Sequence, residues 1–266
     1  MTAKKNIVFS HANGFPAKSY KTFFEYFDGF HIKYIEAYGK STYPIDRNWH
    51  SSARELIDFV EKNFSSPVTA LGHSFGGAVS LFACAQRPDL FDKVVVIEPP
   101  LFGPGKRWPI GLLRLINLHH LLFPLPRWAK RRRNSFPSTE EAVAYFQKRP
   151  LFKNFDPRCL QDYAQAGLVK EKEGDELGLF IPRELESGIF DTMPCFFLPK
   201  MSKMKPTTIL YAKSLLSYKR DDLRWFKKAI SPLWLFPYDG GHMAPLEHPE
   251  RIAKLVMEIM SRSTAK

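Results

Sequence analysis

A serine flanked by glycines stands between a strand-like run and a helix-like run. The residues read Gly72-His73-Ser74-Phe75-Gly76, which fits the pattern Gly-x-Ser-x-Gly, and Gly77 extends it. A sharp turn between a strand and a helix exposes a serine hydroxyl, and small residues around it relieve the crowding of the two elements. The pattern therefore predicts that Ser74 is a nucleophile rather than part of a structural turn.

A serine hydroxyl needs a base to become a good nucleophile, and His242 is the candidate. It follows the last strand-like run and two glycines in the segment YDGGHMAPLEHPE, before a final helix expected near Pro249. This position places it at the same end of the sheet as Ser74, the end at which open α/β sheets bind ligands. His73 and His248 lack this placement, and we expect His73 to pack beside the serine.

A third group must orient the histidine, and Glu98 is our first choice. It ends the strand-like run VVVIE, and Pro99 and Pro100 prevent a helix from starting at once. A carboxylate buried at the end of an apolar strand is costly without a partner, and His242 would be that partner.

Three aspartates remain alternatives for the acid. Asp221 and Asp222 come well after the strand-like run 207–212, where capping the next helix is their natural task. Asp239, in the segment YDGGH, is more simply a turn residue. Geometry therefore favours Glu98 over the aspartates.

Acyl transfer also needs backbone N–H groups that point at the developing negative charge. One is expected from Phe75, at the start of the helix after the serine, where the helix dipole also helps. The other is expected from the turn after the first strand, in the segment SHANGFPAKSY, where Phe15 or Asn13 would donate its amide.

Alternating strands and helices are expected to position these groups. The predicted strands lie at residues 6–11, 31–37, 67–73, 93–98, 207–212 and 232–238. The clearest helical stretches lie at residues 49–64, 75–87 and 249–260. Several strands are continuously apolar, as in strands buried on both faces, and the alternation predicts right-handed crossovers and a mostly parallel sheet. The alternation stops between Pro99 and Pro206, so we expect a largely helical insertion over one end of the sheet.

The chain resembles the α/β-hydrolase superfamily, in the branch that carries a cap. The matching motifs are HANGFPA at 11–17, GHSFGG at 72–77 and GGHMAPLEHPE at 240–250, which lie at the beginning, middle and end of the chain. PRELESGIF at 182–190 resembles a cap segment of some bacterial members.

The resemblance implies an α/β-hydrolase core with an inserted cap. We expect the core to comprise residues 1–99 and 206–266, and the cap residues 100–205. Family members usually have two strands before the turn at residues 11–17, whereas only a few residues precede that strand here. We therefore predict a reduced, mostly parallel sheet of about six strands, with the cap after the fourth.

In this family the serine attacks, the histidine acts as base and an acid orients the histidine, which implies these roles for Ser74 and His242. The acid usually follows the strand at 207–212, where this chain offers no carboxylate at the turn. Some capped relatives, among them certain haloalkane dehalogenases, place it after the strand that follows the nucleophile, which matches Glu98. Dehalogenases and epoxide hydrolases, however, use an aspartate nucleophile, so Ser74 argues against their chemistry.

The function implied is that of a serine esterase without a cofactor or metal, which cleaves a carboxylic ester or thioester. Acyl transfer, C–C bond cleavage or lyase chemistry with the same Ser–His pair is an alternative. A non-catalytic ligand-binding protein on the same scaffold is another, as plant hormone receptors show.

The charge balance points to anionic partners of some kind. The 266 residues include 39 Lys and Arg against 27 Asp and Glu, a net charge of +12. Such a surface can favour phosphates, anionic lipid or acidic small molecules. The dense run KRRR at 130–133 has no nucleic-acid-binding signature beside it, so we read it as a solvated basic face and expect no nucleic-acid partner.

The cysteines and apolar runs suggest a cytoplasmic protein. The three cysteines, Cys84, Cys159 and Cys195, lie far apart without a metal-binding spacing, which fits a reducing compartment. The apolar run at the amino terminus is too short for a signal peptide. The run that starts at Ile110 is interrupted by polar residues and does not make a membrane span.

The insertion should decide the substrate, but its sequence leaves the substrate open. Residues 107–128 and 193–201 are apolar and aromatic. They can pack on the core, line an apolar tunnel for a small-molecule acyl substrate, or rest on an anionic membrane as part of a basic, apolar cap. Glu184 and Glu186 can face the pocket or solvent, and we assign them no role. The sequence does not indicate an oligomeric state.

Overall fold

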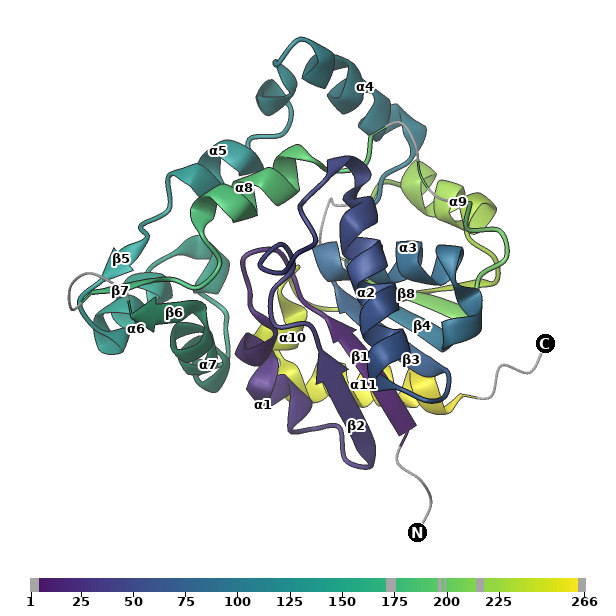
Figure 1. Cartoon of the computed structure of the whole chain (residues 1–266), viewed down its shortest axis with the longest axis horizontal. Helices are drawn as coiled ribbons and strands as arrows, with labels where there is room; N and C mark the ends of the chain where they lie inside the picture. Colours follow the sequence, from purple (N-terminus) through teal and green to yellow (C-terminus); the bar gives the residue numbers. More distant parts are fainter. Residues whose placement is uncertain (1–4, 171–175, 196–197, 199, 214–217, 263–266) are drawn as a thin grey trace.

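A six-stranded parallel sheet forms the core of the molecule (Figure 1). The computed structural model describes residues 5–170, 176–195, 198, 200–213 and 218–262. The strand order is β2-β1-β3-β4-β8-β9. The strands are β1 (Lys5–Ser10), β2 (Phe30–Tyr34), β3 (Val68–His73), β4 (Phe91–Ile97), β8 (Thr207–Ala212) and β9 (Leu233–Tyr238). The prediction of about six parallel strands is confirmed, and each predicted strand overlaps one of these.

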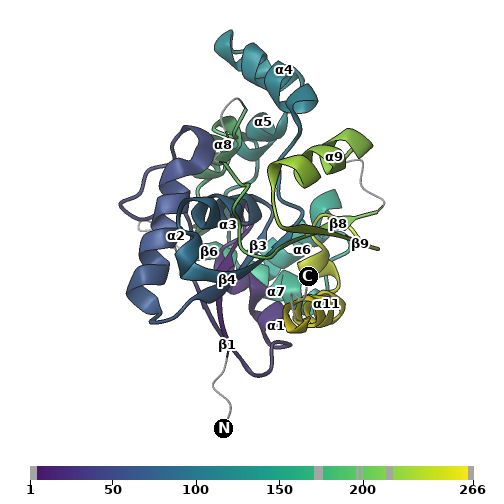
Figure 2. The same ribbon diagram turned by 90° about the vertical axis from the view of Figure 1, so that its right-hand side faces the viewer.

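Helices cover both faces of the sheet (Figures 1 and 2). One face packs against α2 (His50–Asn63), α3 (Phe75–Gln86) and α9 (Arg220–Ala229). The other packs against α1 (Lys21–Phe24), α10 (Ala244–Glu247) and α11 (Pro249–Ser261). Successive side chains of a strand point to opposite faces, and in β1 Ile7 and Phe9 join one hydrophobic cluster while Val8 joins the other. Burial on both faces explains why inner strands such as β3 and the end of β4 are continuously apolar.

The register of the strands brings the candidate site residues to one edge of the sheet. His73 pairs with Ile97, Ile97 with Leu210, and Ala212 with Tyr238. The segments that follow β3, β4 and β9 therefore all leave the sheet at its carboxyl edge, with β8 between β4 and β9.

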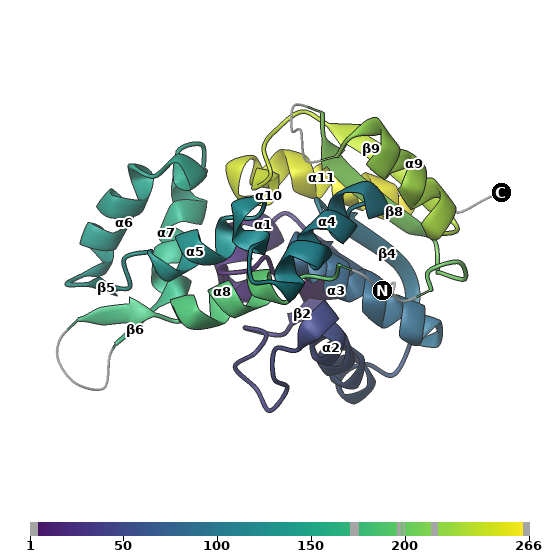
Figure 3. The same cartoon turned by 90° about the horizontal axis from the view of Figure 1, so that it is seen from above.

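The insertion lies between β4 and β8 and is largely helical, as predicted. Its helices are α4 (Pro104–Leu115), α5 (Leu125–Lys130), α6 (Thr139–Gln147), α7 (Pro157–Gly167) and α8 (Arg183–Asp191). Short 3₁₀ helices occur here and in the core, at Ala17–Tyr20, Arg47–Trp49, Pro88–Leu90, His119–Leu121 and Pro150–Phe152. Seen from above, α6 and α7 extend to one side of the core, while α5 and α8 run next to each other (Figure 3).

The insertion also contains a small antiparallel sheet that the sequence did not indicate. Its order is β5-β7-β6, and its strands are β5 (Ser135–Phe136), β6 (Leu168–Lys170) and β7 (Leu177–Leu179). Strands of two or three residues are too short to show an alternating pattern, so sequence periodicity could not reveal them.

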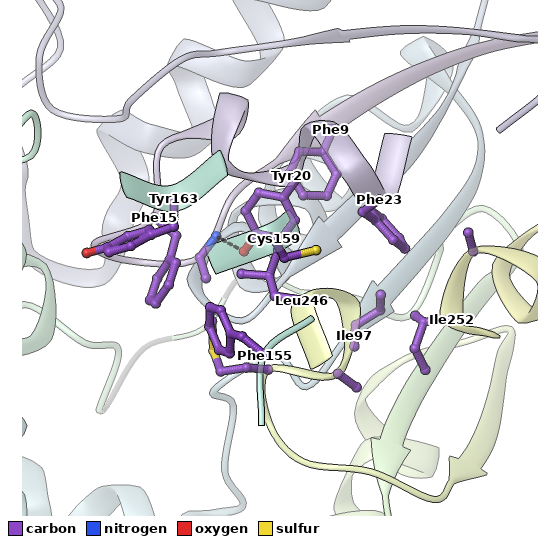
Figure 4. Packing of buried hydrophobic residues seen from close by; sticks show 14 of the residues in the cluster. Phe9, Phe15, Tyr20, Phe23, Ile97, Phe155, Cys159, Tyr163, Leu246 and Ile252 are labelled. Carbon is purple, nitrogen blue, oxygen red and sulfur yellow. Dashed lines mark hydrogen bonds between the residues drawn. The ribbon is translucent and has the colours of Figure 1, made fainter. Parts of the chain in front are cut away.

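A cluster of aromatic side chains packs between the insertion and the core (Figure 4). The ring of Phe15, from the turn after β1, lies 4.8 Å from that of Tyr163 on α7 and 6.1 Å from that of Phe155. Nearby, the Asp162 carboxylate on α7 accepts hydrogen bonds from the amide of Thr22 at 2.8 Å and from its hydroxyl at 2.6 Å. The turn after β1 is therefore held between the sheet and the insertion.

Candidate active site

Ser74 occupies a strained turn between β3 and α3. Its backbone angles are φ 51° and ψ −122°, which side-chain-bearing residues rarely adopt. Its amide donates to the Ile97 carbonyl at 2.8 Å, which ties the turn to the end of β4. A Cβ at Gly72 would lie 2.6 Å from the Gly76 carbonyl oxygen, and one at Gly76 would overlap the Ser10 carbonyl. The two glycines are thus required for the close approach of β1, β3 and α3.

The structure places Ser74, His242 and Glu98 in a series of two successive hydrogen-bonding contacts. His242 Nε2 lies 3.0 Å from Ser74 Oγ, and His242 Nδ1 lies 3.4 Å from Glu98 Oε2. An ionised carboxylate can only accept, so Nδ1 carries the proton and Nε2 presents its lone pair to the serine hydroxyl. This arrangement suits proton transfer from Ser74 to His242.

Glu98 is buried directly after β4, with only 2% of its surface exposed. Its φ of 51° turns the chain away from the strand direction. Oε1 accepts the Ala212 amide at 2.6 Å, at the end of β8, which leaves Oε2 for His242. Two donors thereby offset the cost of burying this carboxylate.

Among the described residues, the three alternative acids contact partners other than His242. Asp222 accepts the Lys219 amide at the start of α9 and the Gly103 amide, each at 2.9 Å, in line with the expected capping. Asp221 pairs with Arg224 at the surface, and Asp239 pairs with Lys213.

His73 does more than pack beside the serine. Its Nε2 donates to the backbone carbonyl of His242 at 2.8 Å, and its Nδ1 accepts from the Tyr20 hydroxyl at 2.7 Å. The Tyr20 oxygen in turn accepts the Ala12 amide at 3.3 Å. Burial, together with the nearby His242 ring, lowers the pKa of His73 to about 3, so the ring is neutral at neutral pH. This chain of hydrogen bonds links the turn after β1 to the loop that carries His242.

His11 fixes the same turn from its other side, a role that the sequence did not indicate. Its Nδ1 donates to the Ala12 carbonyl at 2.8 Å, and its Nε2 accepts the Tyr38 amide at 3.1 Å. Burial lowers the pKa of His11 to about 4. The only signal in the sequence is its position at the head of the motif HANGFPA.

The candidate oxyanion donors differ in whether their amides are already engaged. The amide of Phe15 donates to the Ala12 carbonyl at 3.1 Å, inside the turn. Phe75 begins α3, and both Phe75 and Asn13 line the cavity beside Ser74. Within the described ranges, neither of these two amides donates to another protein group. Of the two candidate donors in this turn, Asn13 is therefore the one whose amide is not engaged within the described ranges.

A cavity of about 920 Å³ opens above these residues. Aromatic and aliphatic side chains make up most of its wall, with contributions from core and insertion: Phe15, Trp49, Phe75, Phe102, Phe123, Leu125, Trp128, Phe146, Phe152, Ile189, Phe190 and Met193. Four arginines also line it, namely Arg131, Arg132, Arg133 and Arg149. Such a space suits an apolar group that carries an acidic or polar end.

An ion pair in the cavity wall joins a buried glutamate, one of the two left unassigned, to a half-buried arginine. Glu186 on α8 accepts from Arg132, whose guanidinium also donates to the Tyr163 hydroxyl at 2.5 Å. A Cβ at Gly14 would lie 2.9 Å from Glu186 Cδ, and Asn13 Nδ2 donates to the Glu186 carbonyl at 2.8 Å. The insertion therefore braces the turn that carries Asn13.

The sequence profile of the Alpha/beta hydrolase family matches residues 7–255, most of the chain. The chain belongs to this family. The resemblance seen in the three motifs is thereby confirmed, and so is the fold.

Curated relatives of the family match over shorter stretches. The type I acyl-CoA thioesterase mpaH of Penicillium brevicompactum is 25% identical over 175 residues, which is 57% of this chain and 37% of that protein. The monoglyceride lipase of Mus musculus is 32% identical over 71 residues, 26% of this chain and 23% of that protein. The matches thus cover well under half of the length of either relative.

Solved structures match over nearly the whole chain. The thioesterase domain from the curacin biosynthetic pathway superposes with a TM-score of 0.71 at 14% identity, and the match covers 96% of this chain and 91% of that one. At this identity the likeness shows the fold alone.

Proposed function

We propose that this protein is a serine hydrolase that cleaves a carboxylic ester or thioester with an apolar acyl group. The observation that carries the proposal is the line of hydrogen bonds from Ser74 through His242 to Glu98 at the base of an apolar cavity. Relatives named as an acyl-CoA thioesterase and a monoglyceride lipase support the same substrate class. Residues 100–205 act as the cap that selects the acyl group.

The proposed reaction starts with attack of Ser74 Oγ on the acyl carbon while His242 Nε2 takes the hydroxyl proton. Glu98 keeps the proton on Nδ1 and stabilises the imidazolium as it forms. The amides of Phe75 and Asn13 donate to the oxyanion. His242 then gives its proton to the leaving alcohol or thiol, and afterwards activates the water that releases the acid from Ser74.

Reaction of the intact protein with a fluorophosphonate probe tests this proposal. We expect a single adduct on Ser74 by mass spectrometry, and none in Ser74→Ala. A protein that stays unlabelled, under conditions that label a known serine hydrolase, would overturn the proposal and favour a ligand-binding protein on this scaffold.

A substrate series then separates hydrolysis from other chemistry at the same pair of residues. We expect kcat/KM for p-nitrophenyl esters to rise with acyl chain length, because each buried methylene contributes about 0.8 kcal/mol. Acyl-CoA thioesters of the same acyl groups compare the two leaving groups. A protein that is labelled at Ser74 but transfers the acyl group to an added alcohol, without releasing acid, would be an acyltransferase.

A further inference from the structure

Helix α4 packs Ile110 on the core but turns three large apolar side chains toward solvent, while its two arginines contact the protein. Trp108, Leu112 and Leu115 lie on its outer side and are 54%, 60% and 69% exposed. On the inner side, Arg107 donates to the Cys195 carbonyl at 3.1 Å and Arg114 to the Met193 carbonyl at 2.7 Å. An ordinary surface helix has apolar side chains only on the side that faces the core and polar ones on the outer side. The outer side of α4 is therefore suited to an apolar environment.

The exposed apolar surface continues beyond α4. We call residues 104–131 the cap ridge. Among the described residues, eleven large apolar side chains are exposed, and eight of them belong to the cap ridge: Trp108, Leu112, Leu115, Ile116, Leu118, Leu121, Leu122 and Trp128. In Figures 1 and 2, α4 projects from the rest of the molecule. The exposed side chains of this helix can therefore reach a flat surface. Exposed apolar surface gathered in this way marks an interaction site.

The positive charge of this region indicates that its partner surface is anionic. From Pro99 to Thr139 the chain has no acidic residue but eight basic ones: Lys106, Arg107, Arg114, Arg127, Lys130, Arg131, Arg132 and Arg133. Arg127, Lys130 and Arg131 are exposed in or directly after α5. Exposed leucines and tryptophans beside lysines and arginines are typical of helices that lie in the headgroup region of an anionic bilayer.

We propose that the cap ridge docks on the surface of an anionic lipid bilayer. The proposed docking is peripheral. In the part of the chain that the structure describes, none of the helices has the length and apolar character of a membrane span. A second copy of the chain would also cover the leucines, but a symmetric contact would bring two copies of the same basic region together. Anionic phosphates in the headgroup layer instead neutralise these charges.

The docked surface borders the cavity. Phe123, Leu125 and Trp128 of the cap ridge line the cavity that also contains Ser74. An acyl chain could therefore pass from lipid to cavity along apolar side chains. This consequence rests on the proposed function, whereas docking itself does not.

Vesicle co-sedimentation of the full chain carrying Ser74→Ala tests the docking without any chemistry. We expect binding to phosphatidylcholine vesicles that contain phosphatidylglycerol, weaker binding to phosphatidylcholine alone, and a loss of binding as salt is raised. Leu115→Ser with Leu121→Ser should weaken binding by about tenfold or more, because each leucine loses its burial in lipid. Arg127→Gln with Lys130→Gln should weaken it by about fivefold per charge removed.

Val169→Ser with Trp234→Ser is the matched control, because both side chains are exposed but lie outside the cap ridge. It should bind as tightly as the parent. The proposal is overturned if the parent does not bind anionic vesicles, or if the cap-ridge variants and the control bind alike. It is also overturned if sedimentation velocity shows a dimer that the two leucine substitutions dissociate while vesicle binding is absent. Circular dichroism confirms that each variant is folded.

Discussion

At the residue scale, the candidate site depends on which ring nitrogens of His242 and His73 carry a proton. Glu98 accepts from His242 Nδ1, and the neutral His73 ring holds the His242 carbonyl. The side chain of His242 is thus oriented by one partner and its backbone by another. Glu98 also lines the cavity that contains Ser74, whereas His73 is not among the residues that line it. His73 therefore acts through His242.

Glu98→Gln tests which acid orients His242. Glutamine fits the same space, but it cannot stabilise the imidazolium and can hold the wrong tautomer. We expect kcat/KM for an ester substrate to fall by roughly 10³- to 10⁴-fold, mostly in kcat. Asp239→Asn is the matched control, since this exposed carboxylate pairs only with Lys213 among the described residues, and it should keep parental activity. Retained activity in Glu98→Gln would contradict the assignment.

The sequence predicted this part of the site because each residue follows a recognisable strand. Ser74, Glu98 and His242 come after three apolar runs, and parallel strands end at one edge. Contacts within and between loops carry no such pattern. The engagement of the Phe15 amide by Ala12 depends on how the turn closes, and the pairing of Arg132 with Glu186 depends on how α5 and α8 meet.

At the element scale, the close packing of α3 on the sheet depends on glycine. Gly76 leaves no room for a Cβ beside the Ser10 carbonyl, and that neighbour is backbone, which cannot rotate away. The turn that exposes Ser74 therefore requires β1, β3 and α3 to be in backbone contact.

Gly76→Ala should destabilise the protein and disturb the turn at Ser74. We expect the free energy of unfolding to fall by about 1–3 kcal/mol or more, because an added methyl group forces backbone to move. Gly188→Ala is the matched control, since Gly188 lies in α8 with nothing within 4 Å of an added Cβ. Because Gly188 lies within a helix, this substitution should raise the free energy of unfolding by about 0.5–1 kcal/mol. Urea unfolding measures both, and equal effects of the two substitutions would refute this account of the turn.

At the scale of the whole molecule, two buried neutral histidines link folding to pH. His11 and His73 are fully buried, with pKa values lowered to about 4 and about 3 from the ordinary value of 6.5. Between these values and 6.5 the unfolded chain binds more protons than the folded chain. Stability therefore rises with pH in this window and is lost as pH falls below about 6.5.

His73→Gln isolates one of these two protons. Glutamine can still donate to the His242 carbonyl but does not titrate. We expect the variant to be less stable than the parent at pH 7, because the Tyr20 hydroxyl loses its acceptor at a cost of about 1–3 kcal/mol. Between pH 6 and pH 4, however, its free energy of unfolding should fall less steeply than that of the parent. The difference in slope should be up to about 1.4 kcal/mol per pH unit, the value for one proton.

Urea unfolding at several pH values measures the slope for each protein. Subtracting one slope from the other removes the contribution of the titratable groups that the two proteins share. Parallel curves would mean that His73 titrates alike in the folded and unfolded states, and would remove it as the neutral link between the turn after β1 and the loop of His242.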